Sequence, residues 1–151
     1  MRIAVVGAGG QLGAAIAEEC ASAHDIVTFT RADLDTTDDA AVAAAMTRAR
    51  PEAIVNGRAY TEVDGSEDQP VVALNVNALA VRALARAAET HGAALVHFST
   101  DFVFDGAASA PYLEQDRPNP RSVYAASKLL GEWFALEAPR AYVLRVESLF
   151  G

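Results

Sequence analysis

The sequence has very little cysteine and no long apolar run. One cysteine, Cys20, occurs in 151 residues, so no disulfide can form within the chain, which fits a reducing cytoplasm. No uninterrupted apolar stretch approaches the roughly 20 residues of a membrane-spanning helix. The first ten residues hold one basic residue and a short apolar run, which predicts a buried strand and not a signal peptide. We therefore expect a cytoplasmic protein without membrane association.

Positive charge is also scarce. The 12 Lys and Arg residues are outnumbered by 20 Asp and Glu, which leaves a net charge of −8. An acidic chain without a basic stripe is a poor candidate for nucleic-acid binding. An anionic ligand would have to be held by local features such as a helix N-terminus. The only lysine stands at position 128, and the three histidines lack metal-ligand spacing, so no metal site is predicted.

Short β-branched runs alternate with Ala-rich stretches along the chain, and its length is typical of one domain. The patterns predict strands at 3–6, 26–29, 53–56, 94–99 and 141–146, and helices at 11–23, 38–50, 70–91 and 122–136. Thr36 or Thr37 is the expected N-cap of the second helix, residues 32–35 are a candidate further strand, and 105–121 is a loop. Strict alternation predicts an α/β fold with a doubly wound parallel sheet. We therefore predict a Rossmann-like NAD(P)-binding domain over residues 1–151.

The first predicted strand leads directly into a glycine-rich turn. Gly7, Gly10 and Gly13 form G-x-x-G-x-x-G, whereas G-x-G-x-x-G fails because position 12 is Leu. Glycines permit a tight turn and close approach to a pyrophosphate, and the helix N-terminus that follows favours negative charge. A glycine-rich turn without a ligand is the alternative, but the flanking strand and helix favour a dinucleotide site. Its expected contacts are Gly7, Gly10, Gln11, Leu12 and Gly13.

The second predicted strand ends in a cation. NAD-binding proteins commonly place an acidic residue here to hold the ribose 2′-hydroxyl, whereas this strand ends Thr30-Arg31. Arg31 suits a 2′-phosphate and favours NADP (NADPH) over NAD, although a solvated surface arginine explains the residue equally well. Asp33 and Asp35 are alternative contacts to ribose or adenine. Asp35 and the adjacent Thr36 are counted among the expected cofactor contacts.

Tyr124 and Lys128 lie four residues apart on a predicted helix, so both side chains share one face. A phenol has a pKa near 10 and is a poor acid or base at neutral pH, but a nearby ammonium lowers that pKa. The tyrosine can then exchange a proton with a carbonyl or hydroxyl while a hydride moves to or from nicotinamide. Lys128 can also hold the nicotinamide ribose. Alone, this spacing is common and usually marks an exposed helix face.

The context of the pair makes it more specific. The glycine turn lies upstream in the same predicted fold, and Lys128 is the only lysine. Ser99-Thr100-Asp101 ends the preceding predicted strand, where open α/β sheets bind their ligands. The Thr100 hydroxyl is therefore expected to hydrogen-bond a substrate oxygen. Together these residues predict a nicotinamide-dependent oxidoreductase.

Taken together, the motifs resemble the extended branch of the short-chain dehydrogenase/reductase superfamily. The dTDP-4-dehydrorhamnose reductase family is the most similar, and the resemblance covers the whole chain. Five motifs carry it, in this order: Gly7-Ala-Gly-Gly-Gln-Leu-Gly13, Asn56 with Ala59-Tyr60-Thr61-Glu-Val63-Asp64, Ser99-Thr100-Asp101-Phe-Val-Phe104-Asp105-Gly106, Pro111-Tyr112-Leu-Glu114, and Tyr124-Ala-Ala-Ser-Lys128-Leu-Leu-Gly-Glu132.

The resemblance implies that a 4-keto sugar nucleotide is reduced by NADPH or NADH, as in dTDP-rhamnose biosynthesis. Tyr124 would be the general acid, Lys128 its partner, and Thr100 the hydroxyl that orients the keto oxygen, with Asp101 beside them. Related dehydratases carry Thr-Asp-Glu at this place, because elimination of water needs another carboxylate. Here the third residue is Phe102, which favours a reductase.

The resemblance also extends the expected cofactor site to Ala59, Tyr60 and Ser99. Two departures stand against it. Arg58 occupies a position that is usually small, where the cofactor passes close to the backbone, and Arg145-Val-Glu147-Ser-Leu149 replaces the usual Arg-Thr-Ser-Trp. Arg58 could clash with the cofactor, pair with a phosphate or turn outward, and substrate contacts from residues 145–149 are in doubt.

Enzymes of the extended branch are about twice as long, with a C-terminal domain that grips the sugar nucleotide. The resemblance thus leads us to expect a substrate domain that this chain lacks. It is also compatible with a homodimer. Two alternatives stay open: a non-catalytic NADP-binding regulatory subunit like that of methionine adenosyltransferase, and a sugar-nucleotide epimerase.

Overall fold

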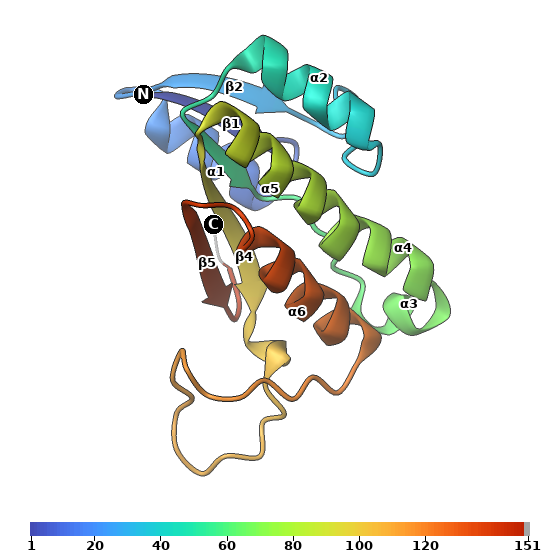
Figure 1. Ribbon diagram of the computed structural model, residues 1–151. Coiled ribbons are helices and arrows are strands. Elements are labelled where there is room, and N and C mark those ends of the chain that lie inside the picture. The colour runs from blue at the N-terminus through green and yellow to red at the C-terminus, as the bar shows by residue number, and fades with distance from the viewer. Residues whose placement is uncertain (150–151) are drawn as a thin grey trace.

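The computed structural model describes residues 1–149, so the last two residues of the predicted domain lie outside the described part. Strands and helices alternate as the sequence predicts (Figure 1). The elements follow in this order: β1 (Arg2–Val6), α1 (Gln11–Cys20), β2 (Asp25–Phe29), α2 (Asp39–Ala49), β3 (Ala53–Asn56), α3 (Val63–Asp68), α4 (Pro70–Leu74), the π-helical turn η1 (Asn75–Leu79), α5 (Ala80–His91), β4 (Ala94–Thr100), the 3₁₀ turn η2 (Asp101–Val103), α6 (Val123–Ala135) and β5 (Ala141–Val146).

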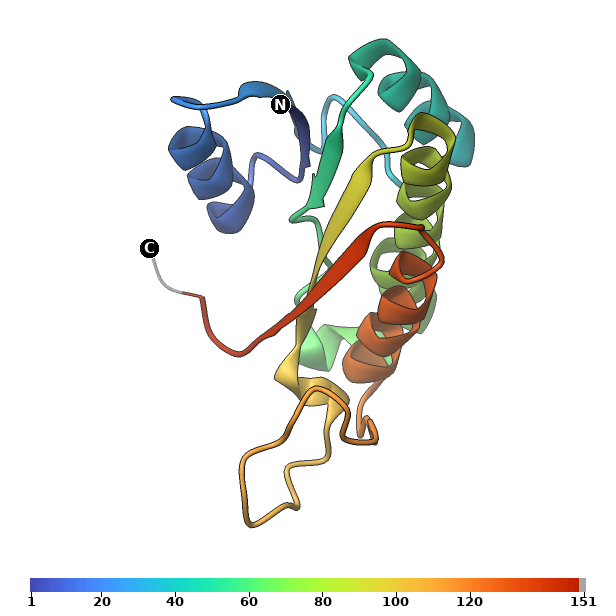
Figure 2. The same cartoon turned by 60° about the vertical axis from the view of Figure 1, so that its left-hand side comes forward.

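The five strands form one parallel sheet in the order β2-β1-β3-β4-β5. The order reverses at β1, because the chain leaves β1 toward β2 and then crosses back to β3. Helix α1 therefore covers one face, while α2, α5 and α6 cover the other (Figure 2). The predicted α/β class and parallel sheet are confirmed. Ligands of such sheets bind at the carboxyl ends of the strands, next to the reversal.

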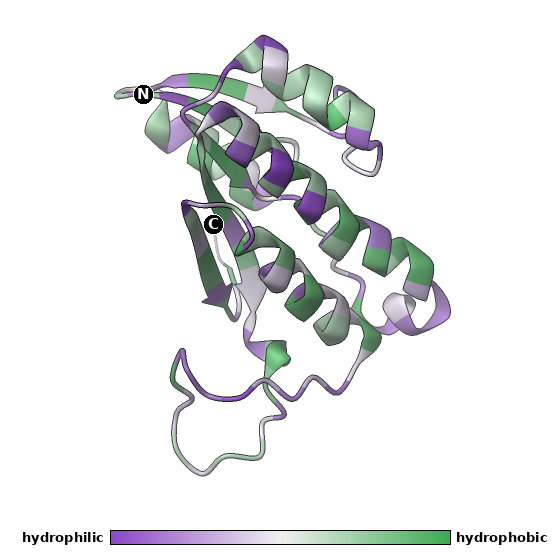
Figure 3. Ribbon diagram, in the orientation of Figure 1, coloured by the Kyte–Doolittle hydropathy of each residue, from purple (hydrophilic) through white to green (hydrophobic). Residues whose placement is uncertain are grey.

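Side-chain alternation along the strands supplies two separate cores. On β1, Ala4 and Val6 face the cluster under α2 and α5, while Ile3 and Val5 face the side of α1. All four are buried, as expected for a strand covered on both faces. The central strands are largely hydrophobic, and the helices carry hydrophilic residues on their outward sides (Figure 3). The sheet thus forms a rigid base for the loops at its carboxyl edge.

Residues 32–35 do not form the short strand that the sequence suggested. Residues 32 and 33 lie in a turn and residues 34 and 35 in no regular element, because two aspartates bond to nearby threonines instead. Asp33 accepts hydrogen bonds from the Thr30 amide and hydroxyl at 2.9 and 2.6 Å. Asp35 does the same with Thr37 at 2.9 and 2.7 Å. Such local bonds compete with a strand ladder.

Helix α2 begins one residue later than the expected caps imply. Its N-cap is Asp38, whose Oδ1 accepts bonds from the amides of Ala40 and Ala41, so the expectation of Thr36 or Thr37 at this position is wrong. An aspartate also interacts favourably with the positive end of the helix. The long helix predicted over 70–91 is present, but the turn η1 interrupts it.

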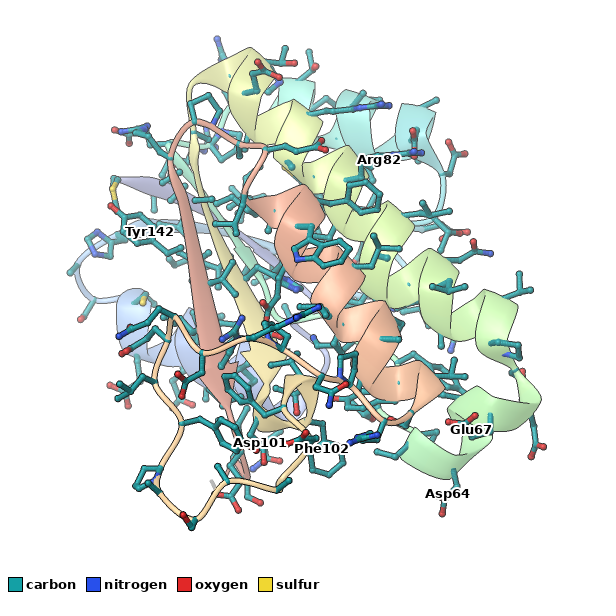
Figure 4. The ribbon with its side chains drawn as sticks, turned by 60° about the horizontal axis from the view of Figure 1, so that its bottom comes forward. Asp64, Glu67, Arg82, Asp101, Phe102 and Tyr142 are labelled. Atoms are coloured by element: carbon teal, nitrogen blue, oxygen red, sulfur yellow. The ribbon has the colours of Figure 1, made fainter. Side chains whose placement is uncertain are left out.

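The segment Pro70–His91 is long and apolar enough to cross a membrane. The sequence did not predict this, because the segment has no long uninterrupted apolar run. However, 61% of its most apolar window is buried inside the fold. That burial is typical of the core helix of a globular domain. Helix α3, which precedes it, was not predicted from the sequence. Glu67 of α3 accepts a hydrogen bond from the Val123 amide at 2.8 Å, which ties α3 to the start of α6 (Figure 4).

Candidate active site

A cavity of about 440 Å³ opens at the carboxyl edge of the sheet. The end of β4, the start of α1 and one face of α6 form its walls. Its lining residues are Gly10, Gln11, Leu12, Asn56, Gly57, Arg58, Ala59, Thr61, Phe98, Ser99, Thr100, Tyr124, Lys128, Val146, Glu147 and Leu149. The glycine turn and the Tyr–Lys pair, more than 100 residues apart in sequence, thus share one cavity.

The glycine turn is built for close backbone packing. Gly7 has a φ of +85°, and a Cβ there would lie 2.7 Å from the amide nitrogen of Arg58. A Cβ at Gly13 would collide with the carbonyl oxygen of Gly7. The two glycines therefore let α1 start directly against the turn. Gly10 is the N-cap of α1 and provides no side-chain cap, so the positive end of the helix faces the cavity.

Polar groups at the end of β4 face the same cavity. Ser99 is buried, and its Oγ has no hydrogen-bond partner among the residues that the structure describes. Thr100 donates to Asp101 Oδ1 at 3.0 Å and accepts from the Phe102 amide at 3.2 Å. A buried hydroxyl without a partner is costly, so a polar ligand group beside Ser99 would satisfy it.

Tyr124 is partly buried against the end of β4. Burial raises the pKa of its phenol, a hydrogen bond with Thr100 lowers it, and the negative charge of Asp101 raises it. The phenol also meets the edge of the Phe102 ring, with centroids 6.1 Å apart and planes at 89°. The Lys128 ammonium makes no resolved contribution and the net direction is upward, so the expectation that it would lower this pKa is wrong.

Lys128 lies on the same face of α6 and is almost fully buried. Its Nζ donates a 2.6 Å hydrogen bond to the carbonyl oxygen of Phe98 on β4. Burial lowers the pKa of Lys128 from 10.5 to about 8, while Glu132 raises it. The ammonium is thus anchored to the sheet at the cavity floor.

A buried polar network, which the sequence analysis missed, fixes the position of α6. Asn77 in η1 accepts from the Tyr60 amide at 2.8 Å and donates to the Tyr60 carbonyl at 3.0 Å. Its amide also donates to Ser127 Oγ at 3.0 Å, and Ser127 donates to the Tyr124 carbonyl at 2.7 Å. The π-helical turn around Asn77 is a signal for this network, because π turns often mark functional sites. That turn can be recognised only in the three-dimensional structure.

His97 lies behind the cavity in β4 and is fully buried. Asn56 Oδ1 accepts from the Arg58 amide, so its Nδ2 is the group that donates to His97 Nδ1, at 3.1 Å. Burial, followed by the charge of Lys128, lowers the pKa of His97 to about 3. The imidazole is therefore neutral and packs in the core behind the cavity.

A second, larger cavity of about 750 Å³ lies between η2 and the loop over residues 105–121. Asp101 and Phe102 of η2, labelled in Figure 4, are among its lining residues. The rings of Phe104 and Tyr112 stack in its wall, with centroids 4.3 Å apart. Tyr112 donates to Asp105 at 2.6 Å, and this bond with others holds the pKa of Asp105 well below its usual range. The loop predicted from composition is therefore ordered by its own contacts.

The predicted cofactor residues fall into three groups. The structure brings Gly10, Gln11, Leu12, Ala59, Ser99, Tyr124 and Lys128 to the first cavity, while Gly7, Arg31 and Asp35 line smaller adjoining cavities. Thr36 is buried and lines none of these described cavities. The Tyr60 backbone is engaged by Asn77 instead, and Gly13 lies beneath the glycine turn. Gly13, Thr36 and Tyr60 are thus the predicted cofactor residues that line none of these three cavities.

Comparison with known proteins gives consistent matches over the whole chain. The family model described as RmlD substrate binding domain matches residues 1–151. A dTDP-4-dehydrorhamnose reductase of Sinorhizobium fredii is 41% identical over 99% of this chain, and one of Mycobacterium tuberculosis is 42% identical over 99%. The crystal structure of the dTDP-4-dehydrorhamnose reductase of Bacillus anthracis in complex with NADP superposes with a TM-score of 0.96 at 37% identity and covers 99% of this chain.

The matches are partial for the relatives themselves. This chain spans 51% and 50% of the two relatives from Sinorhizobium and Mycobacterium, and 54% of the crystallised Bacillus chain. About half of each relative therefore lies outside the comparison.

Proposed function

Because this chain belongs to the RmlD substrate binding domain family, we propose that it is the cofactor-binding and proton-donating part of an NADPH-dependent reductase of a 4-keto sugar nucleotide. The relatives are named dTDP-4-dehydrorhamnose reductases, and a solved one holds NADP. We propose that the residues that contact the sugar nucleotide come from a separate region, equivalent to the part of each relative's chain that lies outside the match.

One observation carries the proposal: Tyr124, Thr100 and Lys128 line the same cavity as the glycine turn. A cofactor seated on the turn and a carbonyl beside Tyr124 would share that space. The buried Ser99 hydroxyl has no partner among the described residues, and the glycines leave room for a pyrophosphate. These residues fit a nicotinamide dinucleotide, with Gly7 and Gly10 at the pyrophosphate and Lys128 at the nicotinamide ribose.

The residues of the chain divide the chemistry among them. The bound nicotinamide supplies a hydride, which reduces the carbonyl carbon to an alcohol. Tyr124 donates the proton that the carbonyl oxygen takes up, since a phenol whose pKa lies above its ordinary value of 10.0 is protonated at neutral pH. Thr100, which interacts with Tyr124, can orient the same oxygen. Phe102 presents an apolar ring where a dehydratase would need an added acid or base.

The proposal is tested with Tyr124→Phe. Removing the hydroxyl deletes the proton donor, and general acid catalysis contributes roughly 10² to 10⁴ in rate. We expect the kcat of this variant for NADPH-dependent reduction of dTDP-4-dehydrorhamnose to be at least 100-fold below that of the natural protein. The Kd for NADPH, measured by fluorescence titration, should stay within twofold.

A tyrosine outside the cavity provides the matched control. Tyr142→Phe removes an exposed phenol from β5, and it should leave turnover unchanged. Full activity of Tyr124→Phe would refute the role of Tyr124. NADPH binding without oxidation by any keto sugar nucleotide would favour the regulatory subunit, and conversion without net cofactor consumption would favour the epimerase. A cytoplasmic location and the absence of nucleic-acid and membrane partners stay predictions from the sequence.

A further inference from the structure

Two arginines from different strand ends converge beyond the glycine turn. Arg31 follows β2, and Arg58 follows β3, the two neighbours of β1 in the sheet. Both line a cavity of about 340 Å³ beside Gly7, Gly9 and Gly10, and both line an adjoining cavity of about 310 Å³. The pair therefore marks the boundary between the glycine turn and the space beyond it.

The residues that line these two cavities include one carboxylate, that of Asp35. Two cations thus face one anion, in a chain with a net charge of −8. The Oδ1 of Asp35 already accepts two bonds from Thr37. The local balance is positive, which favours an anionic ligand here despite the overall field of the chain.

Arg58 is held in place and only partly neutralised. Its amide donates to Asn56 Oδ1 at 3.2 Å, and its backbone touches the turn at Gly7. Its Nε is buried and has no hydrogen-bond partner within the described part of the chain. Burial, followed by the charge of Arg31, lowers the pKa of Arg58, while Asp35 raises it. Burial and the charge of Arg31 both disfavour the charged form of Arg58. An anion between the two guanidinium groups would stabilise that charged form and offset both effects.

The shape beyond Arg58 indicates which anion fits. The farther cavity is lined by Val72 and Val76 as well as by polar side chains, so it can take a flat apolar base. The start of α1 at Gly10 accounts for a pyrophosphate. A phosphate between the pyrophosphate and the base is the 2′-phosphate of an adenosine ribose, and planar guanidinium groups bind phosphate through paired hydrogen bonds.

We propose that Arg58 and Arg31 together form the site for the 2′-phosphate of NADP(H), and that Arg58 sets the preference for NADPH over NADH. The inference rests on the proposed function, because it needs a dinucleotide on the glycine turn. It gives a role to the residue that departs most clearly from the family pattern. Arg58 is thus a specificity residue and does not touch the reacting atoms.

Binding measurements on Arg58→Gln test the proposal independently of turnover. A charged hydrogen bond to phosphate is worth roughly ten- to 100-fold in affinity. We expect Kd for NADPH and for adenosine 2′,5′-bisphosphate to rise at least tenfold, while Kd for NADH and ADP changes less than twofold. Arg48→Gln is the matched control, since it removes the same charge from an exposed position on α2, and should change neither.

The other outcomes separate the two proposals. Equal weakening of NADPH and NADH, or no change in either, would overturn the role of Arg58 and leave the reductase proposal intact. Tighter binding of both would show that Arg58 obstructs the cofactor, which also overturns it. A protein that binds neither nucleotide would refute both proposals. If Arg58→Gln weakens the binding of NADPH more than that of NADH, but the natural protein reduces no keto sugar nucleotide, only the reductase proposal would be refuted.

Discussion

At the residue scale, burial shifts the pKa values of Tyr124 and Lys128 in opposite directions. The spacing of Tyr124 and Lys128 predicted that both lie on one face of a helix, and this is confirmed by the cavity that both line. The expected lowering of the Tyr124 pKa was wrong, because burial and the charge of Asp101 outweigh the hydrogen bond with Thr100. Burial raises the pKa of Tyr124 and lowers that of Lys128. Sequence spacing contains no information about this desolvation.

The lowered pKa of Lys128 predicts a specific pH dependence of stability. Between about 8 and 10.5 the native lysine is already deprotonated while the unfolded one is still charged. The unfolded state then binds more protons, so the free energy of unfolding rises with pH. Lys128→Met lacks this contribution. Relative to the variant, the wild type should gain about 3 kcal/mol across this range, at about 1.4 kcal/mol for each pH unit.

Urea unfolding of both proteins at pH 7.5 and 10.5 measures that difference directly. Other groups titrate in both proteins and cancel in the comparison. A difference that stays constant, or that shrinks with rising pH, would contradict the lowered pKa of Lys128.

At the scale of elements, one arginine connects β5, α6 and the loop over 105–121. Arg145 donates to both carboxylate oxygens of Glu132 on α6, at 2.9 and 2.7 Å. Its guanidinium also lies over the Phe104 ring, 5.0 Å from the centroid, and donates to the Glu114 carbonyl. Phe104 stacks on Tyr112, which bonds to Asp105. The loop is therefore held against the elements that carry Tyr124.

Breaking this ion pair on one side should destabilise the protein strongly. Glu132 is buried, so Arg145→Met leaves a buried carboxylate without its partner and should cost about 3 kcal/mol of unfolding free energy. Arg145→Met combined with Glu132→Leu removes both charges and should recover most of the loss. Urea unfolding of the single and double variants checks this. If the double variant were the less stable of the two, the pair itself would be strongly stabilising.

At the scale of the whole molecule, the two faces of the sheet are covered unequally. Helices α2, α5 and α6 lie on one face, whereas α1 packs against β1 and β2 on the other (Figure 2). On β5, Tyr142 and Leu144 are 61% and 44% exposed, and Tyr142 points away from α6 (Figure 4). With the partly buried Val96 and Phe98 of β4, they form an apolar surface of the β4–β5 region.

This surface should bind a hydrophobic dye, since contiguous exposed apolar area is uncommon on soluble domains. Tyr142→Thr combined with Leu144→Thr keeps residues that favour strands and removes most of the exposed apolar area. We expect fluorescence of bound anilinonaphthalene sulfonate to fall at least threefold. Val71→Thr with Leu136→Thr changes two exposed apolar residues, one on α4 and one just after α6, and should have little effect; an equal fall in both variants would argue against a localised surface.

The sequence by itself determined the fold class, the strand positions to within one residue and the shared helix face of Tyr124 and Lys128. Those features depend on periodicity and short spacings, which are local properties of the chain. It could not determine that Asp33 and Asp35 form turns with threonines, because local hydrogen bonds compete with a strand of the same composition.

Only the tertiary structure decided the rest. It brought Asn77 to Tyr60 and Ser127, and Arg58 to Arg31, because these contacts join segments 17 to 50 residues apart or separate strand ends. It also set the direction of the pKa changes, because burial depends on the packing of the whole chain. Periodicity indicates which residues share an element, and the folded chain determines which elements share a site.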